Sequence, residues 1–149
     1  MELRSLPPYE ADRASAAVLT RVTADHLDGL MHLFAQAWWT RERSREQVAT
    51  MLDSTPATVG LVNPSGKLVA FARAISDFQF KAVIVDVIVD EPLRSTGLGR
   101  RVVSALLHHP VLTEVDDFEL YCDHDLIAYY EALGFARPAR THFMRLTRS

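Results

Sequence analysis

Residues 86–107 read DVIVDEPLRSTGLGRRVVSALL, and the organisation of the whole chain can be worked out from this stretch. It continues a run of β-branched residues over 82–89 that is apolar on both faces, which predicts a buried central strand. A charged turn with a proline follows, and after it comes Arg94-Ser95-Thr96-Gly97-Leu98-Gly99-Arg100. From Leu98 onward the apolar residues recur at helical spacing. The stretch therefore predicts a strand, a glycine-containing loop and the start of a helix.

The loop at 94–100 has the features of a site for a pyrophosphate. The first turn of a helix leaves backbone N–H groups without internal partners, and the helix dipole favours negative charge there. Gly97 and Gly99 have no Cβ, so a ligand can approach the main chain closely, and Arg94 and Arg100 add positive charge. The alternative is that the glycines only permit a tight turn and that the arginines lie on a solvated face.

Two well-known phosphate-binding loops are excluded by the residues themselves. A dinucleotide-binding loop needs a third glycine at position 102, where this chain has Val102. A P-loop needs Gly, four residues and then Gly-Lys-Ser/Thr, which the sequence lacks.

The totals fit one domain. The chain has 149 residues, of which 48% are hydrophobic and 23% charged, the profile of a globular protein with a core of its own. Residues 1–16 carry two adjacent prolines and several charges, so we expect an irregular N-terminal arm, followed by a single domain over 17–149.

Charge and cysteine content favour a cytoplasmic protein without nucleic-acid or membrane partners. The net charge of −3 gives no electrostatic reason to bind nucleic acid or an anionic membrane. No apolar run approaches the ~18 residues of a membrane span, and the first residues lack the apolar core of a signal peptide. The single cysteine, Cys122, permits no internal disulfide, and the scattered histidines suggest no metal site.

The order of expected elements predicts a mixed sheet. We expect strands at 18–22, 58–62, 68–75, 82–89, 118–122 and 140–146, and helices at 23–37, 44–55, 98–108 and 123–133. Three successive strands with short connections imply antiparallel pairing, whereas the strand–helix–strand unit over 82–122 implies a parallel crossover. The fold class is therefore α/β (α+β): a mostly antiparallel central sheet with helices on both faces.

Two motifs resemble those of the GNAT superfamily of acyl-CoA-dependent N-acyltransferases. Arg94, Gly97 and Gly99 match the family's Arg/Gln-x-x-Gly-x-Gly/Ala loop after an apolar strand. Residues 123–135, DHDLIAYYEALGF, are similar to the downstream motif Asn-x-x-Ala-x-x-x-Tyr-x-x-x-Gly-Phe. Tyr130, Gly134 and Phe135 fall on their positions, whereas Asp123 stands where Asn is usual and Leu126 where Ala is usual. The resemblance covers roughly residues 17–146.

The resemblance implies a binding site for acetyl-CoA as co-substrate. In this family the sheet splays beside the central strand, and free main-chain groups pair with the pantetheine arm, which is strand addition by a ligand. That role would fall on the main chain of Val87, Ile88 and Val89. The pyrophosphate would lie on the amides of the loop: Arg94, Ser95, Thr96, Gly97, Leu98, Gly99 and Arg100. Ser95 and Thr96 replace more usual residues, and Asp123 stands near the pantetheine position of the family.

The implied reaction is direct acyl transfer from the thioester to an amine. Tyr130 occupies the family's position for the general acid that protonates the leaving thiolate; its alternative is a helix tyrosine packed in the core. Asp86 is a carboxylate inside an apolar strand, where it is costly unless partnered or functional. Asp86 is either the base that accepts the proton of the amine or a structural residue bonded to a neighbouring loop or to Arg73.

Acceptor residues are expected on two segments. Aromatic rings beside charged groups suit an amine, and the candidates are Trp38, Trp39, Arg41, Arg43, Asp77 and Phe78. The alternatives are a buried anchor for one tryptophan, a solvated face or selection of a carboxylate for the arginines, and a turn role for Asp77. For Cys122 we expect core packing rather than an acyl-cysteine role.

The sequence thus predicts an N-acetyltransferase that moves an acetyl group from acetyl-CoA to a primary amine of a small molecule, with a tyrosine as general acid. The alternatives are a CoA-binding regulatory or interaction module without turnover, and a protein or peptide N-acetyltransferase. A homodimer is a further possibility that the family resemblance raises.

Overall fold

A computed structural model describes residues 16–148 of the chain, which divides into two compact units, residues 1–119 and 120–149. The expected N-terminal arm at 1–16 lies, except for Ala16, outside the described residues. The single domain over 17–149 stays a prediction.

The first unit is built on a five-stranded mixed sheet. The strands are β1 (Ala17–Leu19), β2 (Thr58–Val62), β3 (Leu68–Ser76), β4 (Lys81–Val89) and β5 (Asp117–Glu119). They follow one another across the sheet in chain order. The first three pairings are antiparallel and β4 pairs with β5 in parallel. The connection lengths predicted the pairings of β2 with β3, β3 with β4 and β4 with β5. The predicted fold class is confirmed.

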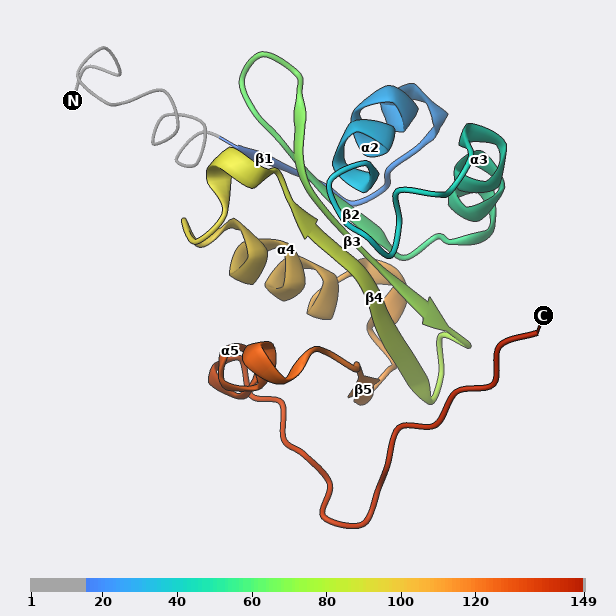
Figure 1. Ribbon diagram of the computed structural model, residues 1–149, viewed down its shortest axis with the longest axis vertical. Coiled ribbons are helices and arrows are strands. Elements are labelled where there is room, and N and C mark those ends of the chain that lie inside the picture. The colour runs from blue at the N-terminus through green and yellow to red at the C-terminus, as the bar shows by residue number, and fades with distance from the viewer. Residues whose placement is uncertain (1–15, 149) are drawn as a thin grey trace. The chain divides into compact units, whose positions relative to one another are not determined.

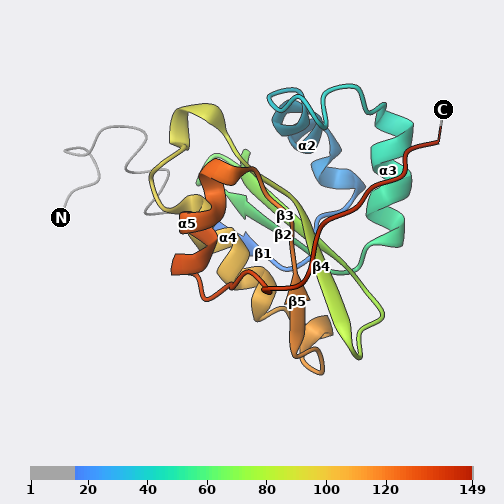
Figure 2. The ribbon, with the colours of Figure 1, turned by 60° about the horizontal axis from the view of Figure 1, so that its bottom comes forward.

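Helices cover both faces of this sheet. Helices α2 (Leu27–Phe34) and α3 (Arg45–Ser54) lie on one face, and α4 (Leu98–Leu107) lies on the other (Figures 1 and 2). Helix α3 begins with a capping box, in which Ser44 and Gln47 satisfy one another's backbone N–H groups. Helix α4 has Leu98, Val102, Val103 and Leu106 buried, so its apolar stripe is the one expected from spacing.

The core on the α2–α3 side forms where the apolar faces of these helices meet the sheet. Phe34 of α2 and Phe71 of β3 pack edge to face with ring centroids 5.8 Å apart, and both rings are buried. Leu30, Leu33, Val48 and Ile88 belong to the same cluster. These residues are far apart in the sequence but pack together, so the cluster joins α2, α3, β3 and β4 and stabilises their arrangement.

A β-bulge interrupts β4 at Asp86. Phe71 is opposite Ile88 and Arg73 is opposite Val85, so β4 has one residue more than β3 between these pairs. Asp86 absorbs the extra residue with a left-handed φ of 56°, which is uncommon for a residue with a side chain. The bulge is positioned in the stretch that the sequence predicted as the central strand.

The pairing between β4 and β5 is short. It covers Lys81 to Val83 of β4, and residues 84–89 have no β5 partner within the described chain. The expected strand at 118–122 is accordingly wrong in its extent, because β5 ends at Glu119. The result is the splay that the family resemblance implied: the second half of β4 keeps β3 on one side and has no strand on the other.

The second unit contains one short helix, α5 (Ile127–Ala132), preceded by a 3₁₀ turn at His124–Leu126. Gly134 has a left-handed φ of 100°, and the N–H of Phe135 bonds the carbonyl of Tyr130 3.1 Å away, which closes the helix as predicted. The strand expected at 140–146 is not formed, since residues 141–148 have no regular secondary structure. The alternation of polar and apolar residues there was too weak to specify a strand without a pairing partner.

Two N-terminal elements are shorter than expected. The first strand covers 17–19 rather than 18–22, and the helix expected at 23–37 is a 3₁₀ turn at Ala24–His26 followed by α2. Thr23 is the N-cap of the 3₁₀ turn, because its hydroxyl accepts from the Asp25 N–H. Helix α2 ends at Phe34. The Thr40 hydroxyl bonds the Phe34 carbonyl, and the N–H groups of Thr40 and Arg41 bond the Ala37 carbonyl.

Replacing Phe71 with Ala tests the core. Because Phe71 is fully buried and packs on Phe34, we expect the free energy of unfolding to fall by about 3–5 kcal/mol. Phe80→Ala is the matched control, since the Phe80 ring is 77% exposed, and its effect should stay within about 0.5 kcal/mol. Urea denaturation measures both, and equal effects would contradict this core.

Candidate functional site

A pocket of about 240 Å³ lies against the second half of β4, the part that β5 does not pair. Its lining comes from three places: the segment after α2, the end of β4 and the loop that follows. The lining residues are Gln36, Ala37, Trp38, Trp39, Val87, Ile88, Val89 and Arg94. The pocket thus joins two sets of residues that the sequence assigned separately, the tryptophans to the acceptor and β4 with Arg94 to the co-substrate.

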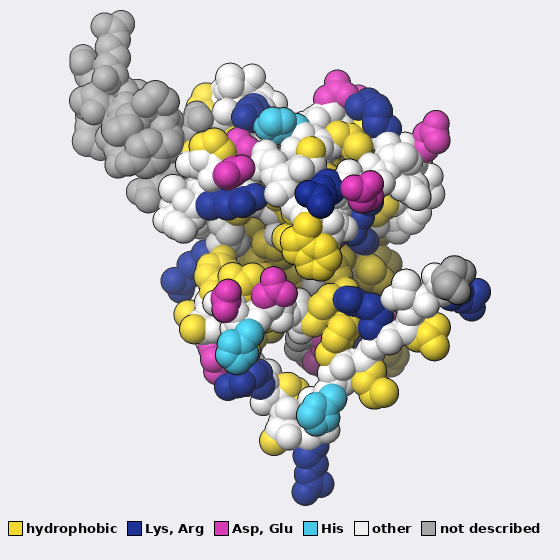
Figure 3. All heavy atoms as spheres, viewed as in Figure 1, with side chains coloured by type: hydrophobic (Ala, Val, Ile, Leu, Met, Phe, Trp, Pro, Cys, Tyr) yellow, Lys and Arg dark blue, Asp and Glu magenta, His cyan; other side chains and the backbone are white. Residues whose placement is uncertain are grey.

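Both tryptophans are at the surface. Trp38 is 68% and Trp39 46% exposed, and their rings meet edge to face with centroids 5.8 Å apart. The alternative of one buried anchor is therefore wrong. Hydrophobic side chains reach the surface near the middle of the face shown in Figure 3, with charged side chains around them. Neither Trp38 nor Trp39 is needed by the core, so they are free to contact a ligand.

The loop at 94–100 has the expected geometry for binding an anion. Gly97 is the N-cap of α4 with φ 94°, and a Cβ built on it would have no atom within 4 Å. Ser95 is also left-handed, with φ 63°. The N–H of Arg101 is the first to bond back, to the Gly97 carbonyl at 3.1 Å, which leaves the amides of Leu98, Gly99 and Arg100 in the unpaired first turn. Glycine at 97 is thus required by the backbone and also keeps the approach open.

Two side chains of the loop bond main-chain carbonyls of the residues just before it. Arg94 is exposed, and its Nε donates to the carbonyl of Val89 at 3.1 Å. The hydroxyl of Thr96 donates to the carbonyl of Leu93. Arg94 therefore already bonds one main-chain acceptor of β4, the carbonyl of Val89.

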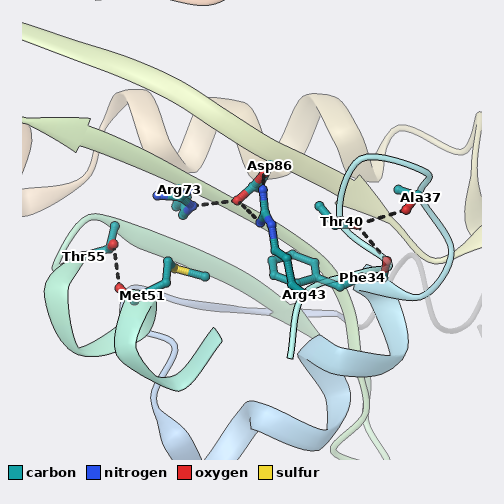
Figure 4. A network of polar contacts seen from close by, with 8 residues as sticks. All are labelled: Phe34, Ala37, Thr40, Arg43, Met51, Thr55, Arg73 and Asp86. Carbon is teal, nitrogen blue, oxygen red and sulfur yellow. Dashed lines mark hydrogen bonds and ion pairs between the residues drawn. The ribbon is translucent and has the colours of Figure 1, made fainter. Parts of the chain in front are cut away.

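Asp86 is held by two arginines. Its carboxylate accepts from Arg43 at 2.7 and 3.1 Å and from the Nε of Arg73 at 2.7 Å (Figure 4). The guanidinium of Arg43 also lies over the Phe34 ring, 5.1 Å from its centroid. Arg43 is therefore neither on a solvated face nor open to an acceptor carboxylate. The geometry is the structural alternative for Asp86 that the sequence left open, with Arg73 as one of the partners.

The charge state of Asp86 follows from these contacts. Burial by itself would raise the pKa of this carboxyl, but the hydrogen bonds and charges of Arg43 and Arg73 outweigh it and lower the pKa from its ordinary value of 3.8. A carboxylate with a lowered pKa is a weaker base than an ordinary one. The environment of Asp86 therefore favours an ionised anchor over proton transfer.

A second buried carboxylate, Asp90, follows β4. It accepts from the amide of Gln36 at 2.8 Å and from Lys67 at 3.0 Å, with His32 3.8 Å away. Burial raises and these partners lower its pKa, with a net decrease. The side-chain oxygen of Gln36 accepts the N–H of Glu91 at 2.8 Å. Sequence patterns gave no sign of Gln36 or Asp90, because their contact joins residues 54 positions apart.

The remaining acceptor candidates do not gather at this pocket. Arg41 is exposed and lies 3.9 Å from Glu42. Asp77 accepts the N–H groups of Gln79, Phe80 and Lys81, which lower its pKa, so it stabilises the β3–β4 turn. Phe78 is in this turn with φ 64°. The structure therefore gives Asp77 the turn role that the sequence offered as its alternative.

In the second unit, Tyr130 is buried and its ring packs edge to face with Phe135 and Tyr129. Burial, followed by the neighbouring Tyr129 and Cys122, raises the pKa of Tyr130 to about 12. Its hydroxyl therefore keeps its proton throughout the neutral range. Asp123 is exposed and is the N-cap of the 3₁₀ turn, without a side-chain cap bond.

Cys122 is exposed, so the expected core packing is wrong. Burial and the charge of Asp123 raise the pKa of its thiol, which lowers the thiolate fraction that an acyl-cysteine route needs. Residues 16–148 contain no group of three or more His, Cys, Asp or Glu side chains that could hold a metal ion. In the same residues no helix has the length and apolar character to cross a membrane.

The family follows from a comparison with known proteins. The model of the acetyltransferase (GNAT) family matches residues 25–135, from the start of the first helical region to the end of the second motif. The chain therefore belongs to the acetyltransferase (GNAT) family.

Relatives and solved structures agree with this assignment. The chain is 32% identical over 138 residues to the chloroplastic GCN5-related N-acetyltransferase 1 of Arabidopsis thaliana, covering 89% of this chain and 70% of the relative. It is 30% identical over 132 residues to the chloroplastic serotonin N-acetyltransferase 2 of Oryza sativa subsp. japonica, covering 85% of this chain and 66% of the relative. A crystal structure from Deinococcus radiodurans R1, of a protein classed among the acetyltransferases, matches with TM-score 0.72 at 27% identity over 89% of both chains.

The ion pairs of Asp86 give a pH-dependent stability. We expect Asp86→Asn to lower the free energy of unfolding at pH 7 by about 2 kcal/mol, less than for a fully buried pair because the Arg43 side chain is 32% exposed. Since the pKa of Asp86 is lower when folded, this contribution is complete above pH 3.8 and is lost as the pH falls below it. Urea denaturation of both proteins between pH 7 and pH 3 measures it. A difference that stays constant over this range would contradict the ionised pair.

Proposed function

We propose that the protein transfers an acetyl group from acetyl-CoA to a primary amine of a small molecule by direct attack, with Tyr130 as the general acid. The observation that carries the proposal is the pocket in which two exposed tryptophans face the half of β4 that β5 does not pair. The family membership supplies the reaction class, and this pocket supplies a place beside β4 for an acceptor.

The residues of the first unit fit acetyl-CoA as co-substrate. The half of β4 without a β5 partner leaves main-chain groups at 84–89 for an extended ligand. The first turn of α4, with Gly97 open in front of it and Arg100 exposed beside it, suits a pyrophosphate. When bound, acetyl-CoA supplies the thioester that the amine attacks. We propose that the amides of 97–100 and the Arg94 and Arg100 side chains orient it.

Tyr130 has the protonation state that a general acid needs. Because its pKa is about 12, its hydroxyl is protonated at neutral pH and can give its proton to the departing sulfur. Its place in the second motif, four residues before Gly134, supports this role. The incoming nitrogen forms the new bond to carbon, the bond to sulfur breaks, and the nitrogen releases its surplus proton to solvent.

We propose that Asp86 is a structural anchor and not the base. Both of its oxygens are occupied by Arg43 and Arg73, and its pKa is lowered. The amine would then enter as its neutral form or lose its proton to water. A cytoplasmic location and a homodimer remain predictions of the sequence.

Thermal melting with acetyl-CoA, followed by thiol release against small amines and peptides, tests the function. Acetyl-CoA at 100 times its Kd should stabilise the protein by about 2.7 kcal/mol. Thiol release should occur with some small amines, and Tyr130→Phe should reduce kcat by about 10²–10⁴-fold while the melting shift remains. Tyr129→Phe, on the neighbouring and partly exposed position, is the control for loss of a tyrosine hydroxyl.

Four outcomes would contradict parts of this proposal. No melting shift would overturn the acetyl-CoA site. A shift without turnover on any amine would indicate a CoA-binding module, and turnover on peptides alone would indicate a protein N-acetyltransferase. Full activity of Tyr130→Phe would remove Tyr130 from the mechanism.

A further inference from the structure

The segment over residues 36–43, here called the tryptophan segment, connects α2 to α3 and has a fixed shape without being a helix. Thr40 is buried, and its hydroxyl donates to the carbonyl of Phe34 at 2.7 Å. The N–H groups of Thr40 and Arg41 bond the carbonyl of Ala37 at 3.2 and 3.0 Å. The N–H of Arg43 bonds the carbonyl of Thr40 at 3.1 Å. These bonds define the turn internally but do not attach it to the sheet.

The start of the segment is attached to the residues after β4 through Gln36. One end of its side-chain amide donates to Asp90 at 2.8 Å, and the other end accepts the N–H of Glu91 at 2.8 Å. Asp90 is itself fixed, because it is buried and paired with Lys67 at 3.0 Å. Both polar groups of the Gln36 side chain therefore fix the segment to the residues just before the loop at 94–100.

The end of the segment is attached to β4 through Arg43. Its guanidinium makes two bonds to Asp86, at 2.7 and 3.1 Å, while lying over the ring of Phe34. A two-bond arginine–carboxylate pair fixes orientation as well as distance. Asp86 is in turn held by Arg73 of β3 at 2.7 Å. The second attachment is thus supported by β3 and β4 together.

Trp38 and Trp39 lie between these two attachments, and they line the pocket against Val87, Ile88 and Val89. The residues that the attachments use, Asp86 of β4 and Asp90 just after it, are on either side of these three. Both ends of the tryptophan segment are therefore fixed to the same part of the chain that forms the opposite wall of the pocket. Attachment of both ends to one part of the chain favours a fixed wall over a lid that opens and closes about hinges.

We propose that Gln36 and Arg43 are positioning residues that hold Trp38 and Trp39 as a preformed wall on the acceptor side of the pocket. This inference rests on the proposed function for its kinetic consequences, but the fixed position of the wall is independent of turnover. The wall places a bound amine against β4 without an ordering step, and displacement of such a wall by an ångström lowers transfer efficiency by up to about 10²-fold.

Fluorescence tests the wall without any activity. The chain contains two tryptophans in all, Trp38 and Trp39, so its tryptophan emission reports on this segment alone. Time-resolved anisotropy of the full chain should show a larger fast depolarising component in Arg43→Ala and in Gln36→Ala than in the wild type, where energy transfer between the two neighbouring rings already contributes one. Arg45→Ala is the matched control: it removes a 2.6 Å arginine–carboxylate bond to Asp28 on the exposed side of α3, and should leave the decay unchanged.

Kinetics tests what the wall does. Arg43→Ala and Gln36→Ala should each raise the KM for the amine by about tenfold and change the KM for acetyl-CoA by less than about twofold. Arg43→Lys, which keeps the charge but loses the two-bond geometry, should fall between Arg43→Ala and the wild type. Thermal melting of each variant confirms that the fold is retained, and Gln36→Ala serves if Arg43→Ala does not fold.

The outcomes separate this inference from the proposed function. An anisotropy decay identical in wild type, Arg43→Ala and Gln36→Ala would overturn the wall, and so would equal rises of both KM values. Absence of turnover in the wild type would contradict the proposed function and leave the anisotropy result to stand on its own.

Discussion

The ion pairs of Asp86 with Arg43 and Arg73 are the interaction on which the site depends. A carboxylate inside an apolar strand is tolerated only when its charge is compensated, and here two arginines compensate it from different elements. Asp86 is also the left-handed residue of the β4 bulge. The charge pairing and the backbone irregularity are therefore located at one residue, and each helps to keep the other in place.

This arrangement organises both walls of the pocket. On one side, the pairing with β5 stops at Val83, so within the described residues the second half of β4 is paired with β3 alone. On the other side, Arg43 holds the end of the tryptophan segment against the same strand. The loop at 94–100 continues from β4 and presents the first turn of α4. A single strand thus positions the candidate acceptor wall and the candidate pyrophosphate site.

The sequence predicted those features that depend on local pattern. The central strand, the buried stripe of α4 and the mixed sheet all follow from periodicity and connection length, and the structure has them. The loop motif at Arg94–Gly99 and the second motif at Tyr130 indicated the family before any comparison. Side-chain spacing and turn chemistry carry this information over short distances.

What the sequence did not predict depends on contacts between distant residues. Asp86 and Arg43 are 43 positions apart, so no local pattern shows whether the carboxylate is a base or an anchor. The same holds for Gln36 with Asp90. Trp38 and Trp39 are acceptor candidates with a buried anchor as the alternative for one of them, and the local pattern does not decide between these; both are exposed where the pocket forms. The strand expected at 140–146 fails for a related reason, since strand formation needs a partner that the pattern does not name.

Hydrogen–deuterium exchange of the full chain, with and without acetyl-CoA, tests most directly whether β4 and the following loop form the co-substrate site. The account predicts slower exchange on binding for amides in 84–89 that β3 does not pair, and for those in 97–100, with little change in α3. Protection confined to other parts of the chain, with β4 and the loop unchanged while acetyl-CoA is bound, would contradict it.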